Sequence, residues 1–260
     1  EMHMHWYDQR LKGIDTGVDD EAPIKLFVMG KNTWCDEDEW PLERTEWTKF
    51  YLSSNGNAAD DGGSLSTEIK TIDQTSDSFT YDPEDPVPSI GSQYQTFDFC
   101  GPRDRSHIQL RPDVLTFTTD VLTEDLEITG PISATVWASS DAIDTDFTAT
   151  LTDLEPEGKA IALCEGIVRA RFRDGTENPQ MIIPGKIYKF DIDMWNTSNS
   201  FNKGHRIRIE VSSSNFPRYN RNLNSGNPIA SDTDITIANQ TIYHGSQYPS
   251  HINLPLIPAR

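Results

Sequence analysis

The residues that could carry chemistry in this chain do not form a recognisable catalytic motif. A serine hydrolase of the α/β type needs Gly-x-Ser-x-Gly at a turn between a strand and a helix. That pattern does not occur, because the Gly-Ser pairs at Gly63, Gly91 and Gly245 lack the second glycine. The sequence also contains no phosphate-binding loop, no dinucleotide fingerprint and no His-Glu-x-x-His zinc motif. We therefore expect no catalytic residue and no cofactor within these 260 residues.

The histidines and paired carboxylates point to structure more than to metal binding. His3 and His5 lie two positions apart, which on a helix directs them to different faces. Asp144 and Asp146 share one face if their segment is extended, but the ligand spacing of a calcium loop does not follow. We expect these two aspartates to make structural hydrogen bonds, and we predict no metal site.

Composition excludes several classes of function. The formal net charge is −19, so an electrostatic contact with a nucleic-acid backbone is not expected. No apolar run approaches the roughly 20 residues that span a bilayer, so we expect no membrane contact. The three cysteines are odd in number and widely spaced, which favours a cytoplasmic protein over a secreted one. The opening residues, EMHMHW, look like the interior of a longer protein.

The elements that would position any site are mostly strands. Period-two alternation of apolar and polar residues recurs along the chain, for example in KIYKFDIDM (186–194) and RIRIEV (206–211). In the second run it predicts that Ile207, Ile209 and Val211 face the core while Arg208 and Glu210 face water. Strands joined by Pro/Gly-rich loops are typical of an antiparallel β-sandwich or jelly roll, similar to galactose-binding folds. A short helix is expected over Glu1–Gly13.

Several motifs, taken in order, resemble one family. The stretches that carry the resemblance are WYDQRLKGID (6–15), APIKLFVMGKNTW (22–34), YDPEDPVPSIG (81–91), GPRDR (101–105), DTDFTATLTDLEPEGKAIAL (144–163) and GHRIRIEVSSSNFPRYNRNLNSG (204–226). Together they look like the C-terminal part of the cocaine-esterase-type (CocE/NonD) serine hydrolases. That family includes α-amino-acid ester hydrolases and relatives of X-Pro dipeptidyl peptidases.

The resemblance implies a domain plan. In such proteins an α/β-hydrolase domain carries the Ser-Asp-His triad, and a jelly roll follows it. Residues 1–15 would then be the terminal helix of the preceding domain, and residues 16–260 the C-terminal β-sandwich. None of the three triad residues maps onto this chain, so the chain is expected to be inactive alone.

The resemblance also suggests which residues meet the upstream domain. Phe97 and Phe99, in a loop that lies near the substrate cleft in the family, are candidates for lining that cleft. Candidates for a domain interface are Arg103, Arg105, Arg218 and Arg221. The two later arginines are expected to pair with carboxylates of either domain. The dipeptide Phe216-Pro217 is expected to dock as a wedge, with Asn and Ser side chains tying down the turn.

The function implied by the resemblance is that of a non-catalytic module that covers and shapes the cleft of a serine ester or X-Pro peptide hydrolase. Its partners would be the upstream domain and the acyl ester or X-Pro peptide substrate, and an oligomer is possible. The alternative is a carbohydrate-binding sandwich, because the same fold serves lectins. Such a module needs an exposed aromatic platform, for which Trp34, Trp40 and Trp47 are available, although their apolar neighbours favour packing.

Overall fold

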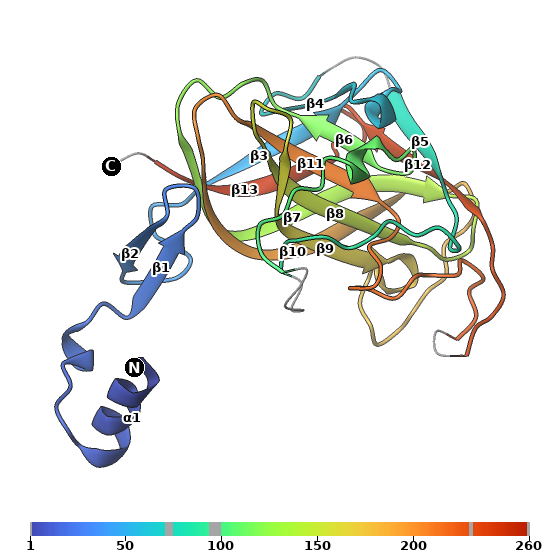
Figure 1. Ribbon diagram of the computed structural model, residues 1–260. Coiled ribbons are helices and arrows are strands. Elements are labelled where there is room, and N and C mark those ends of the chain that lie inside the picture. Colours follow the sequence, from blue (N-terminus) through green and yellow to red (C-terminus); the bar gives the residue numbers. More distant parts are fainter. Residues whose placement is uncertain (1, 71–74, 94–99, 229–230, 259–260) are drawn as a thin grey trace.

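The computed structural model describes residues 2–70, 75–93, 100–228 and 231–258, and they form a β-sandwich with a projecting N-terminal arm (Figure 1). The arm consists of α1 (Met2–Lys12) and the hairpin of β1 (Ile24–Val28) and β2 (Thr33–Glu37). The strands of the sandwich are β3 (Glu46–Ser53), β4 (Gly63–Ser66), β5 (Thr75–Tyr81), β6 (Leu115–Thr118), β7 (Leu126–Ser140), β8 (Asp146–Leu154), β9 (Ala160–Arg169), β10 (Tyr188–Phe201), β11 (Arg206–Ser212), β12 (Ala238–His244) and β13 (His251–Ile257). The expected all-β sandwich is thus confirmed.

The strands pair almost entirely antiparallel. Their order is β5-β12-β7-β13-β3-β4-β6-β11-β8-β9, with β10 paired to β7, and only β4 and β6 run parallel. The two layers meet face to face, and one contact that joins them is between the rings of Phe147 on β8 and Phe190 on β10, 4.6 Å apart. The main core cluster is apolar, and every strand of the sandwich contributes at least one side chain to it.

Both faces of β11 are buried, which corrects the expectation that one of them is wet. Ile207, Ile209 and Val211 are fully buried in the core, as the alternation predicts. Arg208 and Glu210 point the other way, yet they are also buried. The connection between β5 and β6 lies over this outer face and supplies polar partners for both side chains. Period two therefore gives the register of the strand correctly, but it does not reveal that a loop covers the second face.

The arm extends away from the sandwich. No residue of α1 is buried, and Figure 1 shows the helix at the far end of the arm. The hairpin is held to β10 by Met29, whose N–H donates to the carbonyl of Ser198 and whose carbonyl accepts from the N–H of Ser200. The helix is thus not packed on the chain's own core. Within the described residues, no helix has the length and apolar character needed to cross a membrane.

Candidate functional site

A buried ion pair lies beneath the connection between β5 and β6. Arg105, in that connection, is only 2% exposed, and its Nη2 donates to Oε2 of Glu210 on β11 over 2.8 Å. Its Nε contacts both oxygens of the same carboxylate, at 3.2 and 3.1 Å. Gln109 donates a further hydrogen bond of 2.8 Å to Glu210. A guanidinium with this many partners can stay charged inside the fold.

A second buried carboxylate extends the cluster toward the surface. Glu165 on β9 lies 4.0 Å from Nη1 of Arg105 and 3.2 Å from Nη1 of Arg218, which comes from the segment after β11. Burial raises the pKa of Glu165 above its usual 4.5, although both arginines act in the opposite direction. We call these four residues, Arg105, Glu165, Glu210 and Arg218, the Arg105 cluster.

The cluster fixes the path of the connection above it. Nη1 of Arg105 donates to the carbonyl of Ile90 over 3.1 Å, and the backbone N–H of Arg105 donates to Ala160. Between these two anchor points, Ser92 and Gly101 pair in an isolated antiparallel bridge, with a hydrogen bond of 2.9 Å from Gly101 to Ser92. The bridge closes the base of a loop whose middle, residues 94–99, lies outside the described residues.

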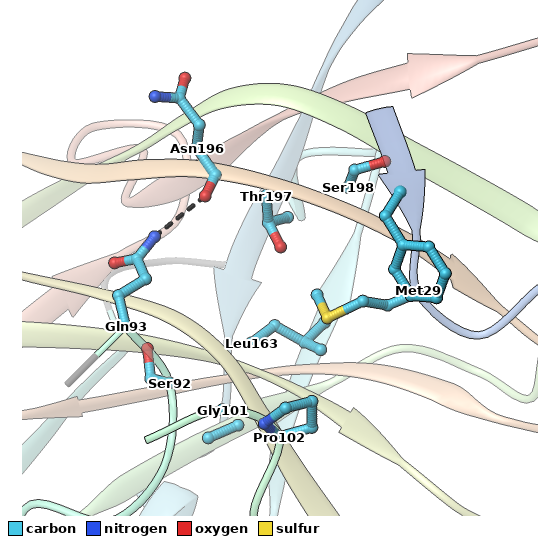
Figure 2. Close-up of a pocket in the computed structure, with 11 residues that line it drawn as sticks. Met29, Ser92, Gln93, Gly101, Pro102, Leu163, Asn196, Thr197 and Ser198 are labelled. Carbon is cyan, nitrogen blue, oxygen red and sulfur yellow. Dashed lines mark hydrogen bonds between the residues drawn. The ribbon is translucent and has the colours of Figure 1, made fainter. Parts of the chain in front are cut away.

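A pocket of about 350 Å³ opens beside this bridge (Figure 2). Its apolar wall comes from the hairpin, the connection and β9, and its polar wall comes from β10 and the bridge. The lining residues are Phe27, Met29, Ser92, Gln93, Gly101, Pro102, Ala162, Leu163, Asn196, Thr197 and Ser198. Gln93 donates a hydrogen bond of 2.9 Å to the carbonyl of Asn196, which joins the loop to β10 (Figure 2). The volume of the pocket falls within the usual range of small-molecule sites.

The segment after β11 is held by backbone pairing with the connection. The N–H of Phe216 donates to Val87, and its carbonyl accepts from Ser89 over 2.7 Å. The hydroxyl of Ser214 accepts from the N–H of Val87. Phe216 itself remains 41% exposed, so the expected docked wedge is wrong. The polar residues around it hold the turn, as predicted, and the backbone of Phe216 makes the contact.

Asn222 joins the same segment to a pair of buried aspartates. Its Nδ2 lies 2.9 Å from Oδ2 of Asp144 and 2.8 Å from Oδ1 of Asp146. Each aspartate also forms an ion pair at 2.8 Å, Asp144 with Arg171 and Asp146 with Arg169. The structural role expected for the two carboxylates is therefore confirmed, because arginine and amide donors occupy their oxygens.

The predicted site residues fall in different places. Arg105 lies inside the fold, where a contact within this chain accounts for its charge. Arg103 is exposed beside the pocket wall, and Arg221 donates to the carbonyl of Pro83 over 2.7 Å. Arg218 pairs with a carboxylate of the sandwich itself, one of the two alternatives expected for it. Phe97 and Phe99 lie outside the described residues.

Sequence reasoning missed two histidine–aspartate pairs. His205 Nδ1 lies 2.8 Å from Asp153 Oδ1, and His244 Nε2 lies 2.8 Å from Asp77 Oδ2. The second pair also has a serine beside it, because the hydroxyl of Ser54 donates to Asp77 over 2.6 Å. The partners of each pair are far apart in the sequence, so no local pattern could have found them.

The Ser54–Asp77–His244 group lacks the geometry of a catalytic triad. In a working triad, serine faces one imidazole nitrogen and the carboxylate holds the other. Here Nε2 of His244 is the nitrogen nearest to both Asp77, at 2.8 Å, and Ser54, at 3.5 Å. Burial raises the pKa of Asp77, but hydrogen bonds from His244, Ser54 and the N–H of Ala58 outweigh it, so the pKa lies below 3.8. The group stabilises the junction of three segments.

The fold and these contacts define an all-β sandwich in which the described residues form no triad and no cluster of three metal-binding side chains. The sequence matches, over residues 16–253, the family described as the X-Pro dipeptidyl-peptidase C-terminal non-catalytic domain. The chain belongs to this family, and it is a non-catalytic C-terminal domain of the kind found in X-Pro dipeptidyl-peptidase and cocaine-esterase-type hydrolases.

Individual relatives agree with this assignment. The chain is 47% identical over 262 residues to the cocaine esterase of Rhodococcus sp. (strain MB1 Bresler), an alignment that covers 98% of this chain and 45% of that protein. An aminopeptidase from a marine sediment Thaumarchaeota archaeon shares 26% identity with a TM-score of 0.85, over 99% of this chain and 44% of that one. An α-amino acid ester hydrolase shares 27% identity with a TM-score of 0.81, over 97% and 44% of the two chains. The chain thus spans less than half the length of each relative.

Proposed function

We propose that this domain covers and shapes the active-site cleft of an upstream α/β-hydrolase domain in a serine ester or X-Pro peptide hydrolase. In this proposal residues 1–15 are the end of that upstream domain, and residues 16–260 are the C-terminal domain, made up of the hairpin and the sandwich. The parent enzyme would act through an acyl-enzyme intermediate formed on a serine of the upstream domain. This chain contributes no reacting group and instead forms one wall of the cleft.

The observation that carries the proposal is the pocket beside the Ser92–Gly101 bridge. Its apolar side chains include Phe27, which is 40% exposed although it lies next to Met29 and the wall of β9. A cleft wall needs apolar groups that stay uncovered until another domain or a substrate reaches them. By the family resemblance, Phe97 and Phe99, which lie outside the described residues, are further candidates for lining the cleft.

The Arg105 cluster supports the proposal because it ties the connection beside the pocket to the strands of the sandwich. A selective pocket needs a fixed shape, since small displacements of its walls alter the fit of the transition state. Arg105 ties the connection to β11 through Glu210 and to Ile90 through a backbone hydrogen bond. Arg103 and Arg221, which are exposed, are the arginines of this region that could still reach carboxylates of an upstream domain.

The proposal is tested in the full-length enzyme with Phe27→Ala. We expect the ratio of kcat/KM values for p-nitrophenyl acetate and p-nitrophenyl benzoate to change by about tenfold, which is the size of effect that a pocket contact gives. Leu110→Ala is the matched control, because Leu110 is an exposed apolar residue that does not line the pocket. If both variants keep the wild-type ratio and melting temperature, the pocket is not part of the cleft.

A carbohydrate-binding role requires uncovered aromatic rings, and the tryptophans are more exposed than expected. Trp34, Trp40 and Trp47 are 64%, 38% and 49% exposed, so the expectation that they are packed is corrected. Trp34 stands on the projecting hairpin, where it pairs with Phe27 across the strands. Trp47 lines a hollow of the sandwich together with Pro131, Ser133, Asp191 and Asp193.

A further inference from the structure

Four strands, β3, β13, β7 and β10, lie next to one another in the sandwich (Figure 1). They carry a row of polar side chains on the face that points away from the core. One line of register across them places side by side, in strand order, Lys49, Asn253, Ser133 and Asp193. The residues that follow or precede these on each strand are buried in the core, namely Phe50, Ile252, Ala134 and Ile192. Because side chains alternate between the faces of a sheet, the first set faces outward.

A hollow of about 460 Å³ lies at one end of this row. Pro131 on β7 has no N–H to donate, and both neighbouring strands shift register close to it, β10 between Asp193 and Asn196 and β13 between Asn253 and Leu256. Such bulges bend strands and open space between their side chains. Trp47, half exposed on β3, forms one wall of the hollow, opposite Ser133 and Asp193.

The polar groups of the row include donors and acceptors, and most of them have no hydrogen-bond partner among the described residues. Lys49 supplies an ammonium donor, Asn253 an amide that donates and accepts, Ser133 a hydroxyl, and Asp193 a carboxylate acceptor. Across the part of the chain that the structure describes, the side chains of Lys49, Asn253 and Ser133 form no hydrogen bond. The charges of Lys49 and Asp193 cancel, so the row offers directional hydrogen bonds without a net charge.

We propose that this face, which we call the Trp47 face (Trp47, Lys49, Asn253, Ser133 and Asp193), binds a neutral oligosaccharide. An indole ring offers a flat apolar surface on which the C–H face of a pyranose can stack, and the row offers both donors and acceptors for hydroxyl groups. Three steps between neighbouring strands span about 14 Å, long enough for a short linear sugar chain. The inference goes beyond the proposed function and does not depend on it.

Other ligands fit the Trp47 face less well. An organic cation could stack on Trp47, but the ammonium of Lys49 in the same row would repel it. The neighbouring carboxylate of Asp191 already has a counter-charge, because it pairs with Lys189 over 2.8 Å. An anion would meet two exposed aspartates, Asp191 and Asp193. A second copy of the chain is disfavoured, because the cores of stable protein interfaces are depleted of charged residues.

The test measures the binding of maltohexaose, cellohexaose and xylohexaose to the 260-residue chain by isothermal titration calorimetry. We expect at least one of these probes to bind with a Kd of about 1 mM or tighter. Trp47→Ala should weaken that binding by about tenfold or more, and Asp193→Asn should weaken it less, since the amide keeps one acceptor. Trp34→Ala is the matched control, because it removes an exposed indole from the hairpin, away from the row, and should leave the Kd unchanged.

Three results would overturn the proposal. The first is heat of dilution only, for all three sugars, up to about 10 mM. The second is binding that Trp47→Ala leaves intact or that Trp34→Ala weakens equally, with unchanged melting temperatures for both variants. The third is a concentration-dependent dimer in sedimentation that Trp47→Ala abolishes, which would make the Trp47 face a contact between copies of the chain. Failure of the ester-selectivity test with Phe27→Ala leaves this proposal standing, so the two are separable.

Discussion

The guanidinium of Arg105 and the carboxylate of Glu210 meet at 2.8 Å inside the protein, and neither side chain is more than 3% exposed. They join a long connection to a strand 105 residues further along the chain. The same arginine donates to the carbonyl of Ile90 and lies 4.0 Å from Glu165, so a single side chain contacts the loop base, β9 and β11. One buried cation therefore links the segments beside the pocket.

Replacing Arg105 should destabilise the whole fold. Arg105→Met leaves Glu210 buried without its counter-charge, and breaking a buried pair in this way typically costs about 3–5 kcal/mol. The measurement is the free energy of unfolding in urea. Arg103→Met is the control, because Arg103 is an exposed arginine two residues away and should shift the value by less than about 0.5 kcal/mol. Equal effects of the two substitutions would contradict the importance of the buried pair.

Glu165 should make stability depend on pH in a defined direction. Burial raises its folded-state pKa above 4.5, so between pH 4.5 and that raised pKa the folded protein holds a proton that the unfolded chain has released. The stability contributed by this residue is therefore greatest below that pH and falls as pH rises through its folded pKa. In Glu165→Gln this fall should be absent.

The measurement is the difference in unfolding free energy between the wild type and Glu165→Gln, taken at several pH values from about 4 to 8. The other titrating groups contribute nearly equally to both proteins and cancel. We expect the wild type to lose stability relative to the variant as pH increases. A difference that stays constant with pH would show that Glu165 is not titrating with a raised pKa.

Asn222 should be a larger contributor to stability than its neighbours in the segment 212–226. Asn222→Ala removes hydrogen bonds to two buried carboxylates and should cost about 2 kcal/mol, since bonds to charged groups are worth more than neutral ones. Asn220→Ala, at an exposed position of the same segment, removes one long, exposed hydrogen bond of 3.2 Å from Arg169 and should cost less, about 0.5 kcal/mol. Thermal melting of both variants separates the two cases, and similar losses would argue against a special role for Asn222.

The strand pattern was predictable wherever an apolar face alternates with a polar one, as in β11 and the first half of β10. The sequence did not predict β12 and β13 as strands, because Asn, Gln and Pro interrupt the alternation in ANQTIYH and HINLPLI. It also gave no sign that a loop covers the outer face of β11. Such coverage depends on contacts between residues about a hundred positions apart, which local periodicity does not contain.

The site was predictable in part. The unusual polar content of the segment after β11 indicated a tightly hydrogen-bonded turn, and Asn222 and Ser214 confirm it. Arg105 was expected at a domain interface because the family resemblance places its loop near the substrate cleft, whereas the structure places its side chain in the interior. The contact of His244 with Asp77 spans 167 residues, and no spacing rule could have linked them.

The chain alone should not react with a fluorophosphonate probe. Ser54 lies near a histidine and an aspartate, but its hydroxyl donates to Asp77 and it accepts the N–H of Gly56, so it is not activated as a nucleophile. Mass spectrometry of the chain after incubation with the probe should show no serine adduct. A stoichiometric adduct that Ser54→Ala removes would reveal a catalytic centre in the sandwich itself.

The most direct test of the claim that this domain shapes a substrate cleft is the acyl selectivity of the full-length enzyme carrying Phe97→Ala. We predict that kcat/KM for small relative to bulky acyl esters changes by about tenfold, equivalent to ~1.4 kcal/mol, while the melting temperature stays within about 2 °C of the wild type. Unchanged selectivity with a large drop in melting temperature would contradict the account, because it would assign Phe97 to packing of the sandwich.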